Sequence, residues 1–217
     1  METKDTLSWA ELPKPIQGQF LETSRLLELK RGEHIYTQGH EPEAIYFVKR
    51  GLVGLVLTSS TGKEHLLRFF REGQVFGHRS LFSKQKHHAS TVALDTTQVL
   101  RVPKEIFLKT LDENPTLYKQ LVQVLSKELG RCEIQRVMIL ENQILARTAQ
   151  SLVYLKDLHP DHSWTRQEIA NFCASTVSTV IKAMAKLESL GLIRQEGRSI
   201  EILDRVGLLK LQDQDKE

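Results

Sequence analysis

The stretch TRQEIANFCASTVSTVIKAMAKLESLGLI, residues 165–193, carries the strongest local signals in the chain. Thr165 followed three residues later by Glu168 is a capping box, which marks the start of a helix. Ile169, Phe172 and Cys173 recur at helical spacing and give that helix one apolar face. The pattern therefore predicts a short amphipathic helix that begins next to Thr165.

A second helix is predicted directly after the first. Ala174 and Ser175 are small enough for a tight turn, and Ser175 is expected to cap the second helix. Its expected buried stripe is Val180, Met184, Leu187 and Leu190, and Gly191 is the expected stop. Residues 192–202 then alternate around a Glu-Gly-Arg turn and predict a β-hairpin. Two helices, a turn and a hairpin form a winged helix-turn-helix, which places one helix in the major groove of DNA.

The residues expected to contact double-stranded DNA begin either helix, line the outer side of the second helix, or lie in the hairpin turn. They are Thr165, Arg166, Gln167, Ser175, Thr176, Val177, Ser178, Thr179, Lys182 and Arg198. Hydroxyl groups and Lys182 can hydrogen-bond to bases or phosphates, and the Val177 methyls can pack on a thymine methyl. Arg166 is placed for a backbone phosphate. The alternative is that both helices belong to an ordinary bundle without a DNA-binding role.

Composition sets limits on the class of protein. The 217 residues carry 30 basic and 27 acidic side chains, and a formal net charge of +3 does not by itself indicate nucleic-acid binding. No apolar run of about 18 residues predicts a membrane span, and no apolar segment after Met1 predicts a secretion signal. Cys132 and Cys173 lack the spacing of a metal or iron–sulfur site and favour a reducing cytoplasm. No arrangement typical of a catalytic site stands out, so the chain is not expected to be an enzyme.

The pattern of apolar residues and glycines differs between segments of the chain. Residues 26–103 hold short β-rich runs separated by glycines, which predict a β-roll, barrel or sandwich. Helical patterns follow from residue 104 onward. We therefore expect an α+β fold with a sensor domain at 1–113, a dimerisation helix at 114–142 and a winged helix-turn-helix domain at 143–217.

The long helix is expected to begin at Asn114-Pro115, because proline is tolerated in a first helical turn. Its apolar residues are Leu117, Leu121, Val124, Leu125, Leu129, Cys132, Val137 and Leu140. A stripe of that length favours pairing with a second copy of the chain in a parallel homodimer. The alternative is that the helix lies on the β-roll.

At this point the chain resembles the Crp–Fnr family of bacterial transcription regulators. The resemblance rests on RGEHIYTQG (31–39), IYFVKRG (45–51), GKEHLL (62–67), GQVFG (73–77) and TRQEIA (165–170). It implies a double-stranded β-roll (a jelly roll) similar to cyclic-nucleotide-binding domains, a long dimer helix and a C-terminal winged helix. It also implies a homodimer that binds a near-palindromic operator. RNA polymerase is a further candidate partner, because activation requires a surface that touches it, but no residue pattern identifies that surface.

The expected effector site departs from the cyclic-nucleotide members of that family. Those members carry a Gly-Glu pair that holds the ribose and an Arg before Ser or Thr that neutralises the phosphate. Here His78 stands in place of the Glu and His87 in place of the Arg, and neutral imidazole lacks a permanent charge. A ligand other than cyclic AMP is therefore expected, although a helix beginning near Gly77 could still hold an anion. The candidate residues are Gly77, His78, Arg79, Ser80, Leu81, His87, His88, Ala89, Cys132 and Glu133.

Several functions remain open at this point. A small-molecule effector could control the regulator, or the regulator could be constitutive. His78, His87 and His88 could bind a metal or haem iron, or they could be exposed or hydrogen-bonded loop residues. A cupin-like metal enzyme and a cyclic-nucleotide-binding regulatory subunit are weaker alternatives, because the His-x-His motif of the first and the Glu and Arg of the second are missing. The sequence identifies no cofactor and no metal ligand set.

Overall fold

The computed structural model describes residues 7–197 and 199–211, and contacts between residues divide the chain into two compact units, Met1–Arg131 and Cys132–Glu217. The boundary falls inside the long helix α4 (Pro115–Glu141). Each unit is described by itself below. Among the described residues, none of the helices combines the length and the apolar character that crossing a bilayer requires.

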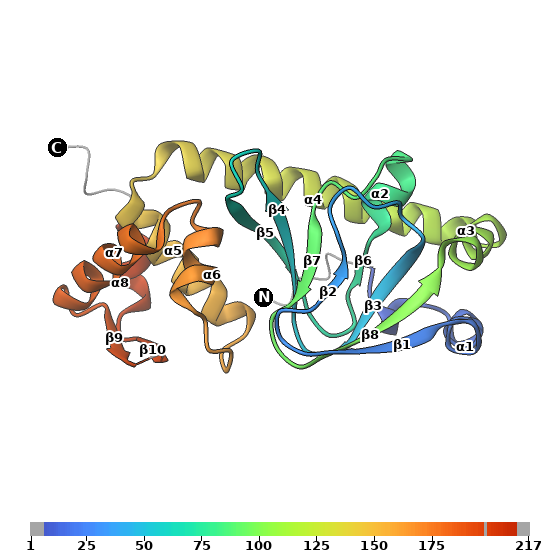
Figure 1. The fold of residues 1–217 in the computed structure, drawn as a ribbon, viewed down its shortest axis with the longest axis horizontal. Helices are drawn as coiled ribbons and strands as arrows, with labels where there is room; N and C mark the ends of the chain where they lie inside the picture. The colour runs from blue at the N-terminus through green and yellow to red at the C-terminus, as the bar shows by residue number, and fades with distance from the viewer. Residues whose placement is uncertain (1–6, 198, 212–217) are drawn as a thin grey trace. The chain divides into compact units, whose positions relative to one another are not determined.

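The first unit is built around two four-stranded sheets (Figure 1). One sheet has the order β1-β8-β3-β6 and the other the order β2-β7-β4-β5, and every neighbouring pair is antiparallel. The strands are β1 (Arg25–Leu29), β2 (His34–Tyr36), β3 (Ala44–Arg50), β4 (Val53–Thr58), β5 (Glu64–Phe70), β6 (Val75–Phe76), β7 (Ser90–Ala93) and β8 (Thr97–Pro103). This arrangement confirms the predicted β-roll.

Strand β3 is buried on both faces and shows how the core is divided. Ala44, Tyr46 and Val48 point into a cluster between the two sheets, where they meet Phe70 and Phe76. The alternate residues Ile45 and Phe47 point to the other side, because successive side chains of a strand face opposite ways. The sequence AIYFV is continuously apolar for this reason.

Helices cover that second face of β3. They are the 3₁₀ turn η1 (Trp9–Glu11), α1 (Lys14–Thr23), α3 (Lys104–Glu113) and the first turns of α4, while the short α2 (His78–Ser83) follows β6. Phe20 of α1 and Phe107 of α3 have ring centroids 6.0 Å apart and belong to the same apolar cluster as Ile45 and Phe47. Leu117, Leu121 and Val124 of α4 complete this cluster.

The predicted apolar stripe of α4 divides into two faces. Leu117, Leu121 and Val124 are buried against the β-roll, as the alternative interpretation of this helix expected. Leu129, Val137 and Leu140 are 61%, 49% and 74% exposed, and Cys132 is exposed as well. The eight residues therefore do not form one buried stripe. At about 100° per residue, Leu129, Val137 and Leu140 turn away from the face that packs on the β-roll, whereas Cys132 shares the direction of that face but is exposed.

The second unit contains the predicted winged helix. Its elements are α5 (Ile144–Leu158), α6 (Arg166–Phe172), α7 (Val177–Ser189), the hairpin β9 (Ile193–Glu196) and β10 (Ser199–Ile202), and α8 (Arg205–Lys210). Leu152 and Leu155 of α5, Ile169 of α6, and Val180 and Met184 of α7 are buried. Figure 1 shows α5, α6 and α7 gathered together, with the hairpin following α7.

Two details of this unit differ from the sequence prediction. Thr176, not Ser175, caps α7, because its hydroxyl oxygen accepts the backbone N–H of Thr179 at 3.2 Å. Leu190 is 46% exposed and lies outside the buried stripe, since the helix has ended there and the chain turns at Gly191, whose φ is +71°. Ala183 is the buried residue that joins Val180, Met184 and Leu187.

Candidate DNA-binding surface and sensor site

The start of α6 is fixed by a reciprocal cap. The Thr165 hydroxyl oxygen accepts the Glu168 backbone N–H at 3.1 Å, and Glu168 Oε2 accepts the Thr165 backbone N–H at 2.8 Å. The His162 imidazole is buried, and its Nε2 lies 3.6 Å from the same Glu168 oxygen. The predicted capping box is therefore confirmed, and it holds the first turn of α6 in one orientation.

The turn between α6 and α7 depends on two small residues. Ala174 has a φ of +55°, a left-handed conformation that a larger or β-branched side chain would strain. The Ser175 backbone N–H donates to the Ala170 carbonyl at 2.9 Å, so the predicted turn residue is used through its main chain. Cys173 is buried beside the turn, and burial raises the pKa of its thiol, which makes it a packing residue.

Helix α7 exposes a polar face opposite its buried one. Thr176, Ser178 and Lys182 are exposed, while Val177 and Thr179 are half-buried. The Thr176 hydroxyl lies 2.7 Å from that of Thr179 and 3.1 Å from that of Ser178. The first turn of α7 therefore presents a cluster of hydroxyls, a valine methyl pair and, one turn later, an ammonium group.

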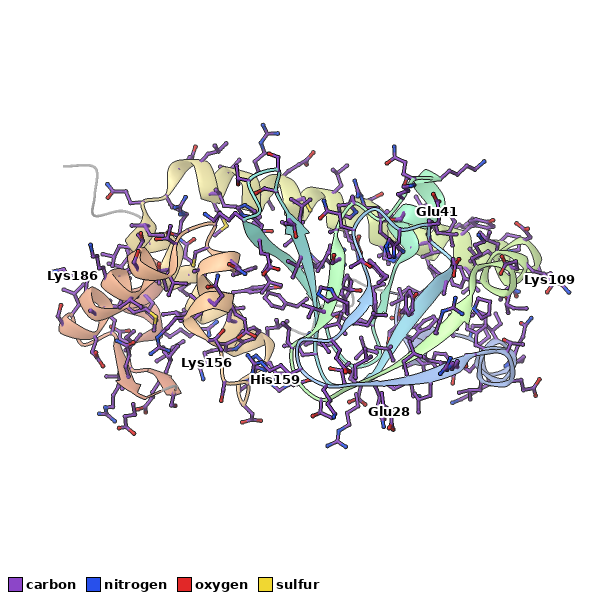
Figure 2. All side chains as sticks on the ribbon, viewed as in Figure 1. Glu28, Glu41, Lys109, Lys156, His159 and Lys186 are labelled. Carbon is purple, nitrogen blue, oxygen red and sulfur yellow. The ribbon has the colours of Figure 1, made fainter. Side chains whose placement is uncertain are left out.

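A second basic residue extends this face. Lys186 is exposed one turn after Lys182 and points away from α7 into solvent (Figure 2). The spacing of four residues places both ammonium groups on the same side of the helix. Lys186 is not among the residues predicted from the sequence to contact DNA.

Arg166 is part of a network with the hairpin. Its Nη2 donates to Gln195 Oε1 of β9 at 2.8 Å and to the Gly197 carbonyl at 3.4 Å. Gln195 is held in turn by Glu188 of α7, which accepts the Gln195 backbone N–H at 2.6 Å and its side-chain amide at 3.0 Å. Burial lowers the pKa of Arg166 while the Glu188 carboxylate opposes that shift. A guanidinium has five donors, so Arg166 keeps N–H groups for a phosphate while one nitrogen joins the hairpin.

Gln167 and Arg198 were also predicted to contact DNA, and the structure describes only the first of them. Gln167 is exposed at the start of α6, and its side-chain amide donates to Asn171 Oδ1 at 2.7 Å. Arg198 lies outside the described residues. Sequence patterns missed Gln195 and Glu188, because an amide and a carboxylate seven residues apart become partners only once the hairpin folds.

The candidate sensor residues 77–81 and 87–89 belong to the first unit, whereas Cys132 and Glu133 belong to the second. Gly77 has a φ of +92° and leads into α2, where His78 and Ser80 are buried and Arg79 is exposed. His78 is 3% exposed, and its Nε2 lies 3.5 Å from Glu128 Oε1 of α4. Glu128 also forms an ion pair with Arg68 of β5. Neither Arg68 nor Glu128 was predicted, since strand β5 and helix α4 meet only in the folded chain.

His87 and His88 lie in the segment that follows α2. His87 is 3% exposed and its ring stacks on Tyr36, with centroids 3.7 Å apart and an interplanar angle of 10°. Burial lowers the pKa of His87, and burial together with Arg79 and His87 lowers the pKa of His88 to about 4. Both imidazoles are therefore neutral near pH 7 and provide no permanent charge for a phosphate.

Of the alternatives for the three histidines, exposed or hydrogen-bonded, exposure does not hold for His78 and His87, because the β-roll buries both rings. Within residues 7–197 and 199–211, no group of three or more His, Cys, Asp or Glu side chains is placed to hold a metal ion. Leu81 is half-buried and Ala89 is buried, whereas Cys132 and Glu133 are exposed on α4.

Comparison with known proteins gives the same picture of both units. Residues 26–114 match the cyclic nucleotide-binding domain family, and residues 146–211 match the Crp-like helix-turn-helix domain family. The chain is 29% identical over 194 residues to the transcriptional activator protein Anr of Pseudomonas protegens, covering 84% of this chain and 78% of Anr. The chain belongs to the Crp–Fnr family of transcription regulators.

Two further proteins are similar to this chain. A CRP-like cAMP-activated global transcriptional regulator of Mycobacterium tuberculosis is 24% identical over 187 residues, covering 82% of this chain and 84% of that protein. The solved structure of FixK2 from Bradyrhizobium japonicum has the same fold, with a TM-score of 0.75 and 22% identity over 85% of this chain and 95% of that one. As a member of this family, the chain is a DNA-binding transcription regulator.

Proposed function

We propose that this Crp–Fnr regulator acts as a homodimer on a near-palindromic duplex site. The exposed face of α7 is the observation that carries the proposal, because Thr176, Ser178 and Lys182 face solvent while Val180 and Met184 on the other side are buried. Hydroxyl, methyl and ammonium groups at the start of a helix suit base edges in the major groove. In this proposal Thr165, Arg166 and Gln167 contact the phosphate backbone.

The proposed dimer uses α4. Val122, Leu129, Ile134, Val137 and Leu140 are between 49% and 74% exposed on this helix. Apolar side chains at this density on one helix favour association with a second helix of the same kind. The proposal keeps the division into a sensor domain (1–113), a dimerisation helix (114–142) and a DNA-binding domain (143–217).

The proposed regulation passes through the β-roll. A small effector other than cyclic AMP, held near α2 and the segment 87–89, would shift α4 and thereby the DNA-binding domain. His87 and His88 are neutral and leave a cyclic phosphate without the charge it needs, which supports this choice. Several relatives are named transcriptional activators, so we propose that the bound dimer contacts RNA polymerase in the bacterial cytoplasm.

Selection of bound sequences from random duplexes tests the DNA-reading surface. The wild type is expected to enrich two inverted half-sites whose centres lie about 10 base pairs apart. The double variant Val177→Arg, Ser178→Glu is expected to enrich a different half-site. The control Val206→Arg, Leu209→Glu places the same two charges on exposed positions of α8 and should leave the selected sequence unchanged. An unchanged half-site in the α7 variant would remove α7 from the reading surface.

Purified protein without any added ligand separates a controlled regulator from a constitutive one. A controlled regulator binds its selected duplex weakly in this state, and a constitutive regulator binds at full strength. The same preparation, examined by native mass spectrometry and absorption spectroscopy, also reports the subunit mass and any metal, haem or nucleotide that stays bound.

A further inference from the structure

Helix α4 carries one carboxylate in the face that packs on the β-roll. Leu117, Leu121 and Val124 of this face are buried, and Glu128 follows at the same helical spacing with its side chain only 11% exposed. A carboxylate in that position needs charged or hydrogen-bonding partners, because burying it alone is costly. The partners of Glu128 are therefore part of how α4 is held.

Two cationic or ionisable groups of the β-roll face Glu128. Arg68 of β5 forms an ion pair with it, and His78 of α2 places Nε2 3.5 Å from the same oxygen. The Arg68 guanidinium also lies 5.1 Å from the Phe70 ring centroid. Burial alone would raise the pKa of Glu128, but His78 and Arg68 lower it to about 2, so the carboxylate is ionised at neutral pH.

The His78 ring is incompletely satisfied. Neither ring nitrogen has a hydrogen-bond partner, and 3.5 Å to Glu128 exceeds an ordinary N–H···O distance. A buried polar ring without close partners has unused hydrogen-bonding capacity. An oxygen of a small ligand could approach it more closely than Glu128 does.

We propose that Glu128 is a built-in occupant of an anion site, and that a small carboxylate or phosphate ligand replaces its carboxylate at Arg68 and His78. The inference rests on the effector-responsive function proposed above and gives the chemical class of the effector. The exchange leaves no buried charge unpaired, because the incoming anion forms the ion pair with the Arg68 guanidinium in place of Glu128. Glu128 is then released, and α4 loses its ion pair with Arg68 of β5 and its contact with His78 of α2.

The exchange couples ligand binding to the position of α4. An anion that competes with Glu128 favours the state in which α4 is detached beyond Val124, and reciprocity requires that removal of the Glu128 charge favours the anion. Neutral ligands and cations gain nothing from Arg68. Arg79, which is exposed on α2 and close enough to lower the pKa of His88, adds a second positive charge near the site.

Calorimetric titration of the full-length protein without DNA tests the exchange, with inorganic phosphate and acetate as separate probes and tetramethylammonium chloride as the salt control. Glu128→Gln is expected to bind one of the two anions about tenfold more tightly than the wild type, a typical size for such coupling. Glu43→Gln, which removes the carboxylate of the exposed Glu43–Arg101 pair, should titrate like the wild type. Equal affinities of wild type and Glu128→Gln for both anions would overturn the proposal.

A second variant protects the test against misfolding. Arg68→Met, Glu128→Leu replaces the ion pair by apolar groups of similar length, an exchange that folded proteins often tolerate. It should abolish anion binding, and binding that survives in it would also overturn the proposal. Hydrogen exchange supplies an independent readout, since amides 125–131 should exchange faster in the anion-saturated wild type. Unchanged exchange there contradicts the release of α4.

The anion titrations and the duplex selection test separate proposals, so a negative result in one does not decide the other. Loss of duplex binding with an intact anion response would remove the proposed DNA-reading surface and keep the sensor site. Intact duplex binding with no anion response would remove the role of Glu128 and keep the regulator.

Discussion

Leu129→Ala on α4 is the sharpest test of the proposed dimer. The side chain of Leu129 is 61% exposed in the single chain, so its substitution should leave the folded monomer nearly unaffected. In a two-fold dimer each copy would bury this side chain against the other. The substitution therefore weakens association of the two chains, and its free-energy cost applies twice because each chain of the dimer carries it.

The magnitude follows from the buried surface. Three carbons are lost per chain at about 0.8 kcal/mol each, and scaling by the exposed share gives about 1.5 kcal/mol per chain and about 3 kcal/mol per dimer. The dimer dissociation constant should rise by roughly a hundredfold.

Sedimentation equilibrium over a wide concentration range measures this constant directly. Leu21→Ala is a matched control, because Leu21 of α1 is 55% exposed and the same atoms are removed away from α4. Denaturant unfolding of both variants should show equal stability of the monomeric chain. Equal dissociation constants for the two variants, or a wild type that stays monomeric at all concentrations, would refute the assignment of α4 as the dimer helix.

Three further predictions concern the two sites. Gln195→Leu should weaken binding to every duplex about fivefold without changing the selected half-site, because Arg166 loses the shorter of its two bonds to the hairpin at a cost of about one hydrogen bond. Fluorescence anisotropy with specific and random duplexes measures both affinities. The lowered pKa of Glu128 stabilises the fold above about pH 4.5, and this contribution is lost as the pH falls toward about 2, so denaturant unfolding of Glu128→Gln should show a flatter pH dependence than the wild type across that window. Thr165→Ala should lower the free energy of unfolding by about 1 kcal/mol through loss of the hydroxyl that caps α6, as measured by thermal denaturation, whereas an unchanged stability would show that this hydroxyl does not stabilise the helix.

Much of the second unit could be predicted because its signals are local. The Thr165–Glu168 cap lies within four residues, and the apolar spacing of α6 and α7 lies within one helix each. The error at Ser175 arose because Ser and Thr are both good caps and stand side by side. Only backbone geometry, with Ala174 in the left-handed region, decides that the helix begins after Thr176.

The polar networks could not be predicted, because they join residues far apart in the sequence. Arg68 and Glu128 are sixty residues apart, and Arg166 and Gln195 are 29 residues apart. Periodicity assigns a residue to a face of its own helix or strand but does not say which element lies opposite. Glu128 could have been noticed as a charge within the spacing of Leu117, Leu121 and Val124, but its cationic partners come from β5 and α2.

The two faces of α4 explain how one helix can serve both proposals. With about 100° between successive residues, Glu128 falls in line with Leu121 and Val124, whereas the adjacent Leu129 turns to the exposed side. A ligand that displaces Glu128 would therefore act on the helix from the β-roll side while Leu129 remains free to bind a second chain. If both proposals hold, Glu128→Gln should change anion affinity without changing the dimer constant, and Leu129→Ala should do the reverse at protein concentrations where the dimer persists. A variant of either residue that shifts both quantities together would mean that the faces are coupled through helix rotation, which is the movement that effector binding would then use.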